Sequence, residues 1–253
     1  MKARIGVPPL LVFVVLLVGW EGACRSGWVA DYLLAPPSAV ARALVQEANE
    51  LFGAFAITAF CAFLGFALSS CLGITLAIAL HSSTWAFRAF YPYAVIFQSV
   101  PIIAVAPLLV IWFGYGSPTV VASAFIASLF PVIMASLTGL RSTGPELREL
   151  FRLYGASRSA TLLKLVLPMA LPSILTGLRI AAGLAVIGAI VGEFIGGGGL
   201  GSVIDAARTQ QRLDKVFAAV FLASVLGALA IAGIDVLNRV ALERWEPRRR
   251  EVV

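Results

Sequence analysis

The sequence predicts an all-α integral membrane protein with about six transmembrane helices. Two observations lead to this fold class. Of the 253 residues, 60% are hydrophobic and only 13% are charged, whereas soluble domains carry about 25% charged residues. The apolar residues also gather into six stretches, each long enough for a bilayer-crossing helix of about 20 residues. The chain therefore suits one membrane domain without a second large soluble one.

The six predicted spans differ in length and in what flanks them. The second is long enough to tilt or to project beyond the bilayer. Lys2 and Arg4 precede the first span, as in a signal peptide, but Glu21 does not suit a cleavage site, so we expect a retained helix. The spans are residues 5–23, 52–80, 92–113, 118–139, 172–195 and 216–238.

The Lys and Arg residues indicate the orientation of the chain. With both termini in the cytoplasm, 13 of these residues lie inside and five lie outside. Cytoplasmic loops carry such an excess of positive charge, and an even number of spans agrees with this placement. The net charge of +6 is therefore explained by topology, and we do not expect a nucleic-acid partner.

The residues that could carry chemistry are few. Cys24, Cys61 and Cys71 show no CxxC spacing, and His81 is the single histidine. This set predicts no metal site, no cofactor and no disulfide scaffold. An integral membrane enzyme would need converging catalytic groups, and an ion-coupled secondary transporter would need charged clusters within its spans. Both remain as alternatives, although Arg179 is nearly alone among charges inside the spans.

Two segments are expected on the outer side. Residues 24–50 contain the turn APPSAV, after which Ser38 or a neighbour should cap a helix through ALVQEANELF. Residues 192–201, GEFIGGGGLG, lack the GxxxxGK[ST] pattern of a phosphate loop and follow no strand, so they predict a flexible, closely packed turn. Residues 202–215 are polar enough for a water-exposed helix or loop.

The segment of residues 143–168 stands out as charged and amphipathic. Thr143 is placed to cap a helix that begins with Pro145. Its apolar residues follow helical spacing and should share one face. A helix of this kind either lies on the lipid surface or docks on a soluble partner. The apolar face is formed by Leu147, Leu150, Phe151 and Tyr154.

The second half of this segment predicts a bend and a second helix. Gly155 should end the first helix because it tolerates positive φ without a Cβ clash. The second helix should begin near Ser157 and end at Pro168 and Pro172, which would redirect the chain into the fifth span. The result would be a bent pair of helices at the cytosolic face.

This spacing resembles the EAA-type loop of binding-protein-dependent ABC importer permeases. Glu149 is followed six residues later by Gly155, and Leu165-Val166-Leu167-Pro168 then matches the apolar-x-Leu-Pro end of that loop. Leu150 and Phe151 stand where the family has two alanines. Residues 100–116 and 171–201 also resemble the permeases of nitrate, sulfonate, taurine and bicarbonate importers. Permeases for thiamine-pyrimidine or riboflavin-type substrates are similar too.

The resemblance implies the permease subunit of an ATP-driven importer, a transport subunit and not an enzyme, in the bacterial inner membrane. It implies a homodimeric pore, two cytosolic ATPase subunits and an extracytoplasmic solute-binding protein. The substrate would be a sulfonate, nitrate, taurine, bicarbonate or a heterocyclic precursor. The expected parts are residues 1–50 (first helix and outer crossing), 51–240 (permease core) and 241–253 (basic cytoplasmic tail).

The resemblance also implies roles for the loop residues. Glu149 would make a polar contact with the ATPase, Gly155 would form the bend, and Ala156 with Ser157 would form the surface of closest approach. The alternative for Glu149 is a solvated charge paired with Arg152 three residues on. The full set of expected coupling residues is Glu149, Arg152, Gly155, Ala156, Ser157 and Pro168.

Polar and ionisable groups at membrane depth are candidates for the pore wall. The polarity of Gln98 and Ser99, together with helix-disrupting prolines at 101 and 107, indicates that the third span forms part of the pore wall. For Arg179, snorkelling or pairing within the dimer is the alternative. The pore candidates are Gln98, Ser99, Pro101, Arg179 and Glu193.

Overall fold

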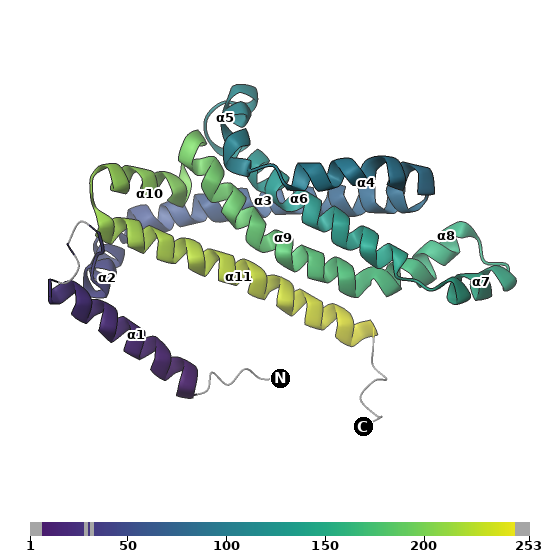
Figure 1. Cartoon of the computed structure of the whole chain (residues 1–253), viewed down its shortest axis with the longest axis horizontal. Coiled ribbons are helices and arrows are strands. Elements are labelled where there is room, and N and C mark those ends of the chain that lie inside the picture. Colours follow the sequence, from purple (N-terminus) through teal and green to yellow (C-terminus); the bar gives the residue numbers. More distant parts are fainter. Residues whose placement is uncertain (1–6, 28–29, 31–32, 246–253) are drawn as a thin grey trace.

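The computed structural model describes residues 7–27, 30 and 33–245, and these residues form helices joined by short turns (Figure 1). The predicted all-α class is therefore confirmed. The helices are α1 (Val7–Arg25), α2 (Pro37–Gln46), α3 (Ala48–His81), α4 (Thr84–Gln98), α5 (Ile102–Phe113), α6 (Ser117–Arg141), α7 (Pro145–Leu153), α8 (Arg158–Thr161), a π-helical turn (Leu162–Val166), α9 (Leu167–Gly196), α10 (Gly199–Thr209) and α11 (Leu213–Trp245).

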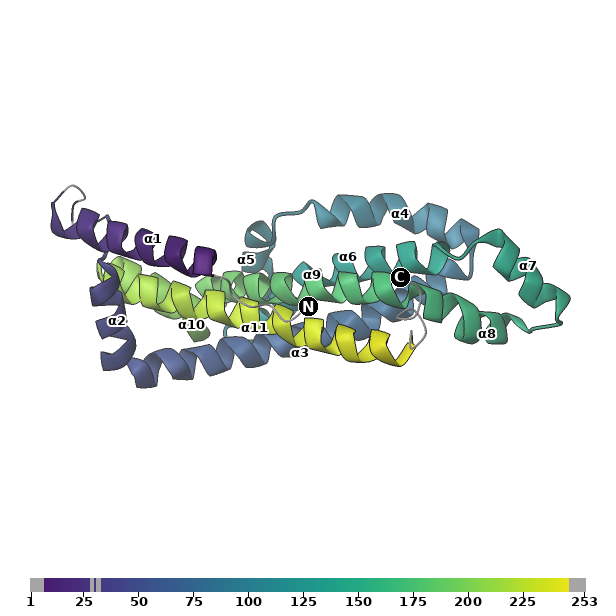
Figure 2. The same cartoon turned by 90° about the horizontal axis from the view of Figure 1, so that it is seen from below.

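The long helices α3, α6, α9 and α11 run side by side and form the body of the protein (Figures 1 and 2). The central one, α9, packs against α6, α3 and α11. Helices α2 and α10 lie at one end of the body, here called the α10 end. Helices α7 and α8 project from the opposite end, here called the loop end. The sites discussed below lie at these two ends and along the side of α6.

The tightest contact in the body is the one between α6 and α9. Small residues face each other along its whole length, so the two backbones approach closely. A Cβ atom added to Gly188 would lie 2.7 Å from the Ala127 Cβ and 2.8 Å from the Ser123 carbonyl oxygen. The Ser123 hydroxyl also donates a hydrogen bond of 2.6 Å to the Gly188 carbonyl. This contact leaves no room for a larger side chain.

Four of the six predicted spans are found as single helices. Helix α1 overlaps the first predicted span from Val7 onward, and its crossing of the membrane stays a prediction. In the described residues, Ala48–His81, Ser117–Arg141, Arg158–Gly196 and Leu213–Val240 are long and apolar enough to cross a membrane. These four correspond to the second, fourth, fifth and sixth predicted spans.

The third predicted span, over residues 92–113 with prolines at 101 and 107, is not a single helix. The structure has two helices, α4 and α5, bent by 98° at a break. The break falls at Ser99–Pro101 because proline lacks an N–H and disfavours helical backbone at the residue before it. Residues 81–91, which separate the second and third predicted spans, are also mostly helical, since α4 begins at Thr84. The cap residue is Ser83, whose Oγ accepts a hydrogen bond from Ala86 N–H at 3.2 Å.

The helix predicted through ALVQEANELF is confirmed only in part, since α2 ends at Gln46 and the residues from Ala48 onward belong to α3. The start of α2 also differs from the prediction. Pro36 occupies the cap position and has no side-chain hydrogen bond to offer. Instead the Glu21 carboxylate of α1 accepts the Ser38 N–H at 3.0 Å and the Ser38 hydroxyl at 2.7 Å. An acidic group suits the positive end of a helix dipole, so this contact joins α1 to α2.

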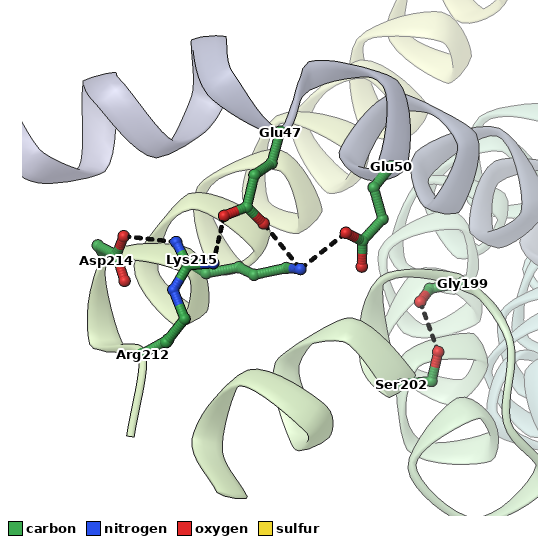
Figure 3. A network of polar contacts seen from close by, with 7 residues as sticks. All are labelled: Glu47, Glu50, Gly199, Ser202, Arg212, Asp214 and Lys215. Carbon is green, nitrogen blue, oxygen red and sulfur yellow. Dashed lines mark hydrogen bonds and ion pairs between the residues drawn. The ribbon is translucent and has the colours of Figure 1, made fainter. Parts of the chain in front are cut away.

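An ion-pair network ties the α2–α3 junction to the start of α11 at the α10 end (Figure 3). Lys215 lies 2.7 Å from the Glu47 carboxylate and 2.8 Å from that of Glu50. Arg212 pairs with Glu47 and, at 2.9 Å, with Asp214. The Lys215 side chain is only 12% exposed. The network therefore fastens two helices that are distant in the sequence.

This network predicts a pH dependence of stability. The Lys215 ammonium lowers the pKa of Glu47, with help from Arg212 and against the effect of burial, from an ordinary value of 4.5. A depressed pKa in the folded state stabilises the fold above the ordinary value, and this contribution is lost as the pH falls through the folded pKa. We expect Glu47→Gln to lower the melting temperature of the detergent-purified protein by a few degrees at neutral pH. This corresponds to a loss of about 1 kcal/mol in the free energy of unfolding.

The difference between wild type and Glu47→Gln should shrink as the pH is lowered below about 4.5, the ordinary glutamate value. Melting curves of both proteins across this range test the prediction. A difference that is constant with pH would mean that the Glu47 charge does not hold the junction.

The contact between α6 and α9 predicts a second effect on stability. Gly188→Ala should destabilise the protein by about 1–3 kcal/mol because the new Cβ overpacks against the α6 backbone. Gly183→Ala is the matched control on the same helix, since its Cβ would meet Ile231 at an ordinary 3.5 Å. Thermal unfolding in detergent measures both, and equal melting temperatures for the two variants would contradict the prediction.

Candidate functional site

The bend at the loop end is built by backbone hydrogen bonds around Gly155. Gly155 has φ +71, in the left-handed region that glycine favours. Its N–H donates to the Arg152 carbonyl at 3.0 Å, and the Ala156 N–H donates to the Phe151 carbonyl at 3.0 Å. These two bonds form a Schellman motif, which closes the end of α7. The predicted bend at Gly155 agrees with this geometry.

Ser157 begins the second arm of the bend, as the sequence predicted. Its backbone is extended, and its Oγ accepts a hydrogen bond from Ala160 N–H at 3.2 Å. Ser157 is therefore the N-cap of α8. The bend thus consists of a closed C-terminus, two connecting residues and a capped N-terminus, which gives it a defined shape.

The start of α7 differs from the prediction in one respect. Pro145 is the first helical residue, as expected, but the cap is Gly144 and makes no side-chain hydrogen bond. The Thr143 hydroxyl is buried and has no hydrogen-bond partner among the described residues. The segment is held instead by Arg148, whose guanidinium donates to the Leu140 carbonyl at the end of α6 over 2.9 Å.

Pro168 was predicted to end the second helix, and this prediction is wrong. Residues Arg158–Gly196 form one helical path of 39 residues, in which Pro168 lies in the first turn of α9. The π-helical turn directly before it bonds Leu167 N–H to the Leu162 carbonyl. This wider turn, together with the missing N–H of proline, lets the helix pass Pro168 without ending. Pro172 also lies inside α9.

Helix α7 presents an uncovered apolar face. None of its residues is buried. Leu147 and Leu150 are 40% and 46% exposed, while Leu153 and Tyr154 are about four-fifths exposed. Phe151, which was predicted on the same face, is half-buried. An exposed patch of large apolar side chains on a helix marks an interaction site.

The charged residues of α7 are also open to solvent. Glu149 and Arg152 are both exposed, and the described part of the chain shows no ion pair between them at 4.0 Å or less. Both side chains are therefore free to reach a partner in the geometry described.

A groove runs between the broken pair α4–α5 and the helices α6 and α9. Its volume is about 640 Å³, within the range of small-molecule sites. The rings of Phe97 and Phe130 stack in it with centroids 5.8 Å apart and planes inclined by 6°. Its lining residues are Phe97, Gln98, Val100, Ile102, Val105, Trp112, Ile126, Ala127, Leu129, Phe130, Pro131, Leu184 and Ile187.

The five predicted pore residues are not brought together. Gln98 lines the groove, while Ser99 and Pro101 are exposed in the break beside it. The other two, Arg179 and Glu193, point elsewhere. Arg179 pairs with Asp235 of α11 at 2.8 Å.

Glu193 is fully buried and holds the beginning of α10. Its Oε2 accepts the Gly201 N–H at 2.8 Å, and the Thr58 hydroxyl of α3 accepts the Leu200 N–H at 2.9 Å. A Cβ on Gly199, which has φ +64, would collide with the Glu193 carboxylate. Within this protomer Glu193 therefore caps a helix and does not face an open path, which does not fit a pore-lining role. The turn predicted over residues 192–201 is shorter in the structure, because α9 continues to Gly196 and α10 begins at Gly199. Of its glycines, Gly199 is closely packed, whereas Gly197 has open space around it.

Sequence reasoning missed three residues that matter here. Thr58 accepts a hydrogen bond from Leu200, 142 positions later in the sequence, and no local sequence pattern predicts such a contact. Asp235 could have been found from the sequence, because an acidic residue near the end of a span usually has a partner. No pattern identifies Phe97, since its stacking partner Phe130 lies on another helix.

Comparison with known proteins agrees with this arrangement. The formylaminopyrimidine transport permease protein ThiX of Halalkalibacterium halodurans is 38% identical over 242 residues, covering 95% of this chain and 96% of that protein. The putative aliphatic sulfonates transport permease protein SsuC of Escherichia coli is 32% identical over 249 residues, covering 97% and 94%.

A solved structure shares the fold. A chain of the MetNI methionine ABC transporter in inward-facing conformations superposes with a TM-score of 0.63 at 20% identity, covering 75% of this chain and 93% of that chain. A family model described as the binding-protein-dependent transport system inner membrane component matches residues 69–243. The chain therefore belongs to the family of binding-protein-dependent transport system inner membrane components, the permease subunits of ABC importers.

Proposed function

We propose that two copies of this chain form the translocation pathway of an importer and that residues 143–168 couple it to two ATPase subunits. Membership of the family already implies ATPase and solute-binding partners and excludes the secondary-transporter and enzyme alternatives. The proposal adds the stoichiometry, the position of the loop and the roles of its residues. The observation that carries it is the bare apolar face of α7 beside a capped bend.

The orientation follows from the charges around the two ends. The loop end carries Arg141, Arg148, Arg152, Arg158 and Lys164. A cytoplasmic position for these residues satisfies the positive-inside rule. Both termini are then cytoplasmic, and the Glu47 network and α10 face the solute-binding protein. The ATPase, which needs cytosolic ATP, would meet α7 and α8.

The continuous helix from Arg158 to Gly196 gives the loop a mechanical connection to the membrane. This path of 39 residues is about 58 Å long at 1.5 Å per residue. A displacement of α8 by the ATPase would therefore move α9, and α6 would follow because the two helices are closely packed. The ATPase must contact the loop differently in its two states, since equal affinity for both states shifts no equilibrium.

Some loop residues would contact the ATPase, and others would set the conformation of the loop. Glu149 and Arg152 are the polar contacts with the ATPase, flanking the apolar face of α7. Gly155 provides the bend, and Ala156 with the cap residue Ser157 provides the surface of closest approach. Pro168 shapes the passage from the loop into α9 beside the π-helical turn.

We propose that the groove beside α6 forms the part of the translocation pathway that each protomer contributes. Gln98 is its polar side chain, and the break at Ser99–Pro101 gives its wall an irregular backbone of the kind that lines cavities in membrane proteins. The imported solute is a small molecule of the kinds that name the relatives, a formylaminopyrimidine or an aliphatic sulfonate.

The coupling role of the bend predicts the effect of Gly155→Leu. A leucine there would be strained at φ +71, although nothing lies within 4 Å of its Cβ, so the bend changes shape while the membrane core keeps its packing. We expect a protein that inserts and binds its partners but hydrolyses ATP without uptake. Uptake and ATPase rates in proteoliposomes of the complete importer measure this, with uptake falling at least about tenfold.

Gly144→Leu is the matched control. It places the same side chain in the same segment with open space around it, at an ordinary φ of −61. This variant should keep most of the uptake. Normal uptake by Gly155→Leu, or equal losses in both variants, would show that the bend is not the coupling element.

A further inference from the structure

We infer that the groove conducts a flat, uncharged heteroaromatic solute that carries adjacent hydrogen-bond donors and acceptors, such as an aminopyrimidine. This inference rests on the proposed function, because it takes the groove as part of the pathway. It names the class of substrate from the chemistry of the lining residues.

The first step concerns charge. The groove-lining side chains are all uncharged, and Gln98 and the Trp112 indole are the polar ones. The two ionisable side chains of α9 are engaged elsewhere, since Arg179 pairs with Asp235 on α11 and Glu193 caps α10. The charges of the spanning helix next to the groove are therefore directed away from it.

The second step is the cost of moving an anion along such a wall. An ionised group taken out of water without a partner is strongly destabilised. Sites that hold nitrate-like or sulfonate-like anions use guanidinium, ammonium or several N–H donors. A neutral ring carries no such cost, and burying its faces against apolar side chains is favourable.

The third step concerns the second copy of the chain. A two-fold symmetric dimer builds both walls of a shared pathway from the same surface. Where the two grooves face each other across the two-fold axis, the opposite wall repeats the uncharged residues of this one.

The fourth step is the shape of the apolar surface. Phe97 and Phe130 stack nearly parallel, and Phe97 is 59% exposed. Trp112 is 65% exposed on the α5 side of the same groove. Exposed aromatic faces bind other aromatic rings by offset stacking. They therefore favour a planar ring over an alkyl chain.

The fifth step is the hydrogen-bonding pattern. A glutamine amide offers one acceptor oxygen and two donor hydrogens side by side. Gln98 can therefore pair with a ring edge that carries a donor next to an acceptor, as the amino group and ring nitrogen of an aminopyrimidine do. A sulfonate offers acceptors alone and would use only half of this amide.

The test compares two solutes in proteoliposomes that hold the permease with its ATPase and binding protein. We expect ATP-dependent uptake of radiolabelled 4-amino-2-methylpyrimidine at mildly alkaline pH, where the ring is uncharged, and none of ethanesulfonate. Uptake of ethanesulfonate without the pyrimidine would overturn the inference but leave the proposed function intact. No ATP-dependent uptake of either solute, with no ATPase bound to the permease, would count against the proposed function itself.

Variants of Gln98 distinguish the effect of the groove on transport from the effect of the binding protein. Gln98→Leu should lower the maximal rate of pyrimidine uptake roughly five- to tenfold, the equivalent of one or two lost hydrogen bonds. The half-saturating concentration should not change, because the binding protein sets it. Gln98→Asn keeps an amide and should retain most of the rate.

Thr75→Val is the control, since Thr75 is an exposed polar residue of α3 outside the groove and should leave uptake unaltered. Gel filtration confirms that each variant assembles with the ATPase. An unchanged rate in assembled Gln98→Leu, or an equal loss in Thr75→Val, would overturn the assignment of Gln98.

Discussion

The close contact between α6 and α9 is the constraint on which the rest of the structure depends. In a bilayer, lipid tails are as apolar as side chains, so helices associate by packing and by hydrogen bonds. Here glycines of one helix meet small residues of the other from end to end, with Gly139 against Ala170 near the loop and Gly196 against Thr119 near α10. The pair therefore behaves as one unit. Because residues 143–168 connect these two helices, the bent loop is fastened to that unit on both sides.

Hydrogen bonds within the loop and to the end of α6 give the loop its shape, although α7 has no buried residue. Arg148 bonds back to the carbonyl of Leu140, and the Schellman motif and the Ser157 cap close both arms of the bend. In this loop, local hydrogen bonds hold the backbone in one conformation, whereas a buried hydrophobic core does so in most other segments. The apolar side chains of α7 are left for another surface, which suits an element that has to be rigid and exposed at once.

Local patterns in the sequence were sufficient for much of this. The bend at Gly155 could be predicted because glycine adopts a positive φ without a Cβ clash. The spans could be predicted because they are long and apolar. Pro168 was misread because the rule that prolines end helices is statistical, and a π-helical turn can absorb the missing hydrogen bond. The break at Ser99–Pro101 was visible as a proline signal, but the 98° angle was not.

The positions of the polar residues could not be predicted, because they depend on contacts between distant segments. From the sequence, Glu193 was a candidate for the pore wall. It is instead buried by α10 and shares the start of that helix with Thr58, far away in the sequence. Arg179 was ambiguous for the same reason until Asp235 was found beside it. An ionisable residue at membrane depth indicates that it has a partner, but the sequence does not identify that partner.

The departure from the family pattern at Leu150 and Phe151 can now be given a physical meaning. Phe151 serves the bend through its backbone carbonyl, which accepts the Ala156 N–H, so any residue type supports the bend there. Leu150 is 46% exposed beside Leu147, and replacing an alanine by leucine enlarges the apolar face of α7. A surface that docks on this face must be hollowed more deeply than one that fits two alanines, because close packing tolerates neither voids nor overlap. On the proposed coupling role, the shape of α7 would select among ATPase partners by the depth of their docking surface, while Gly155 would keep the bend that all of them share.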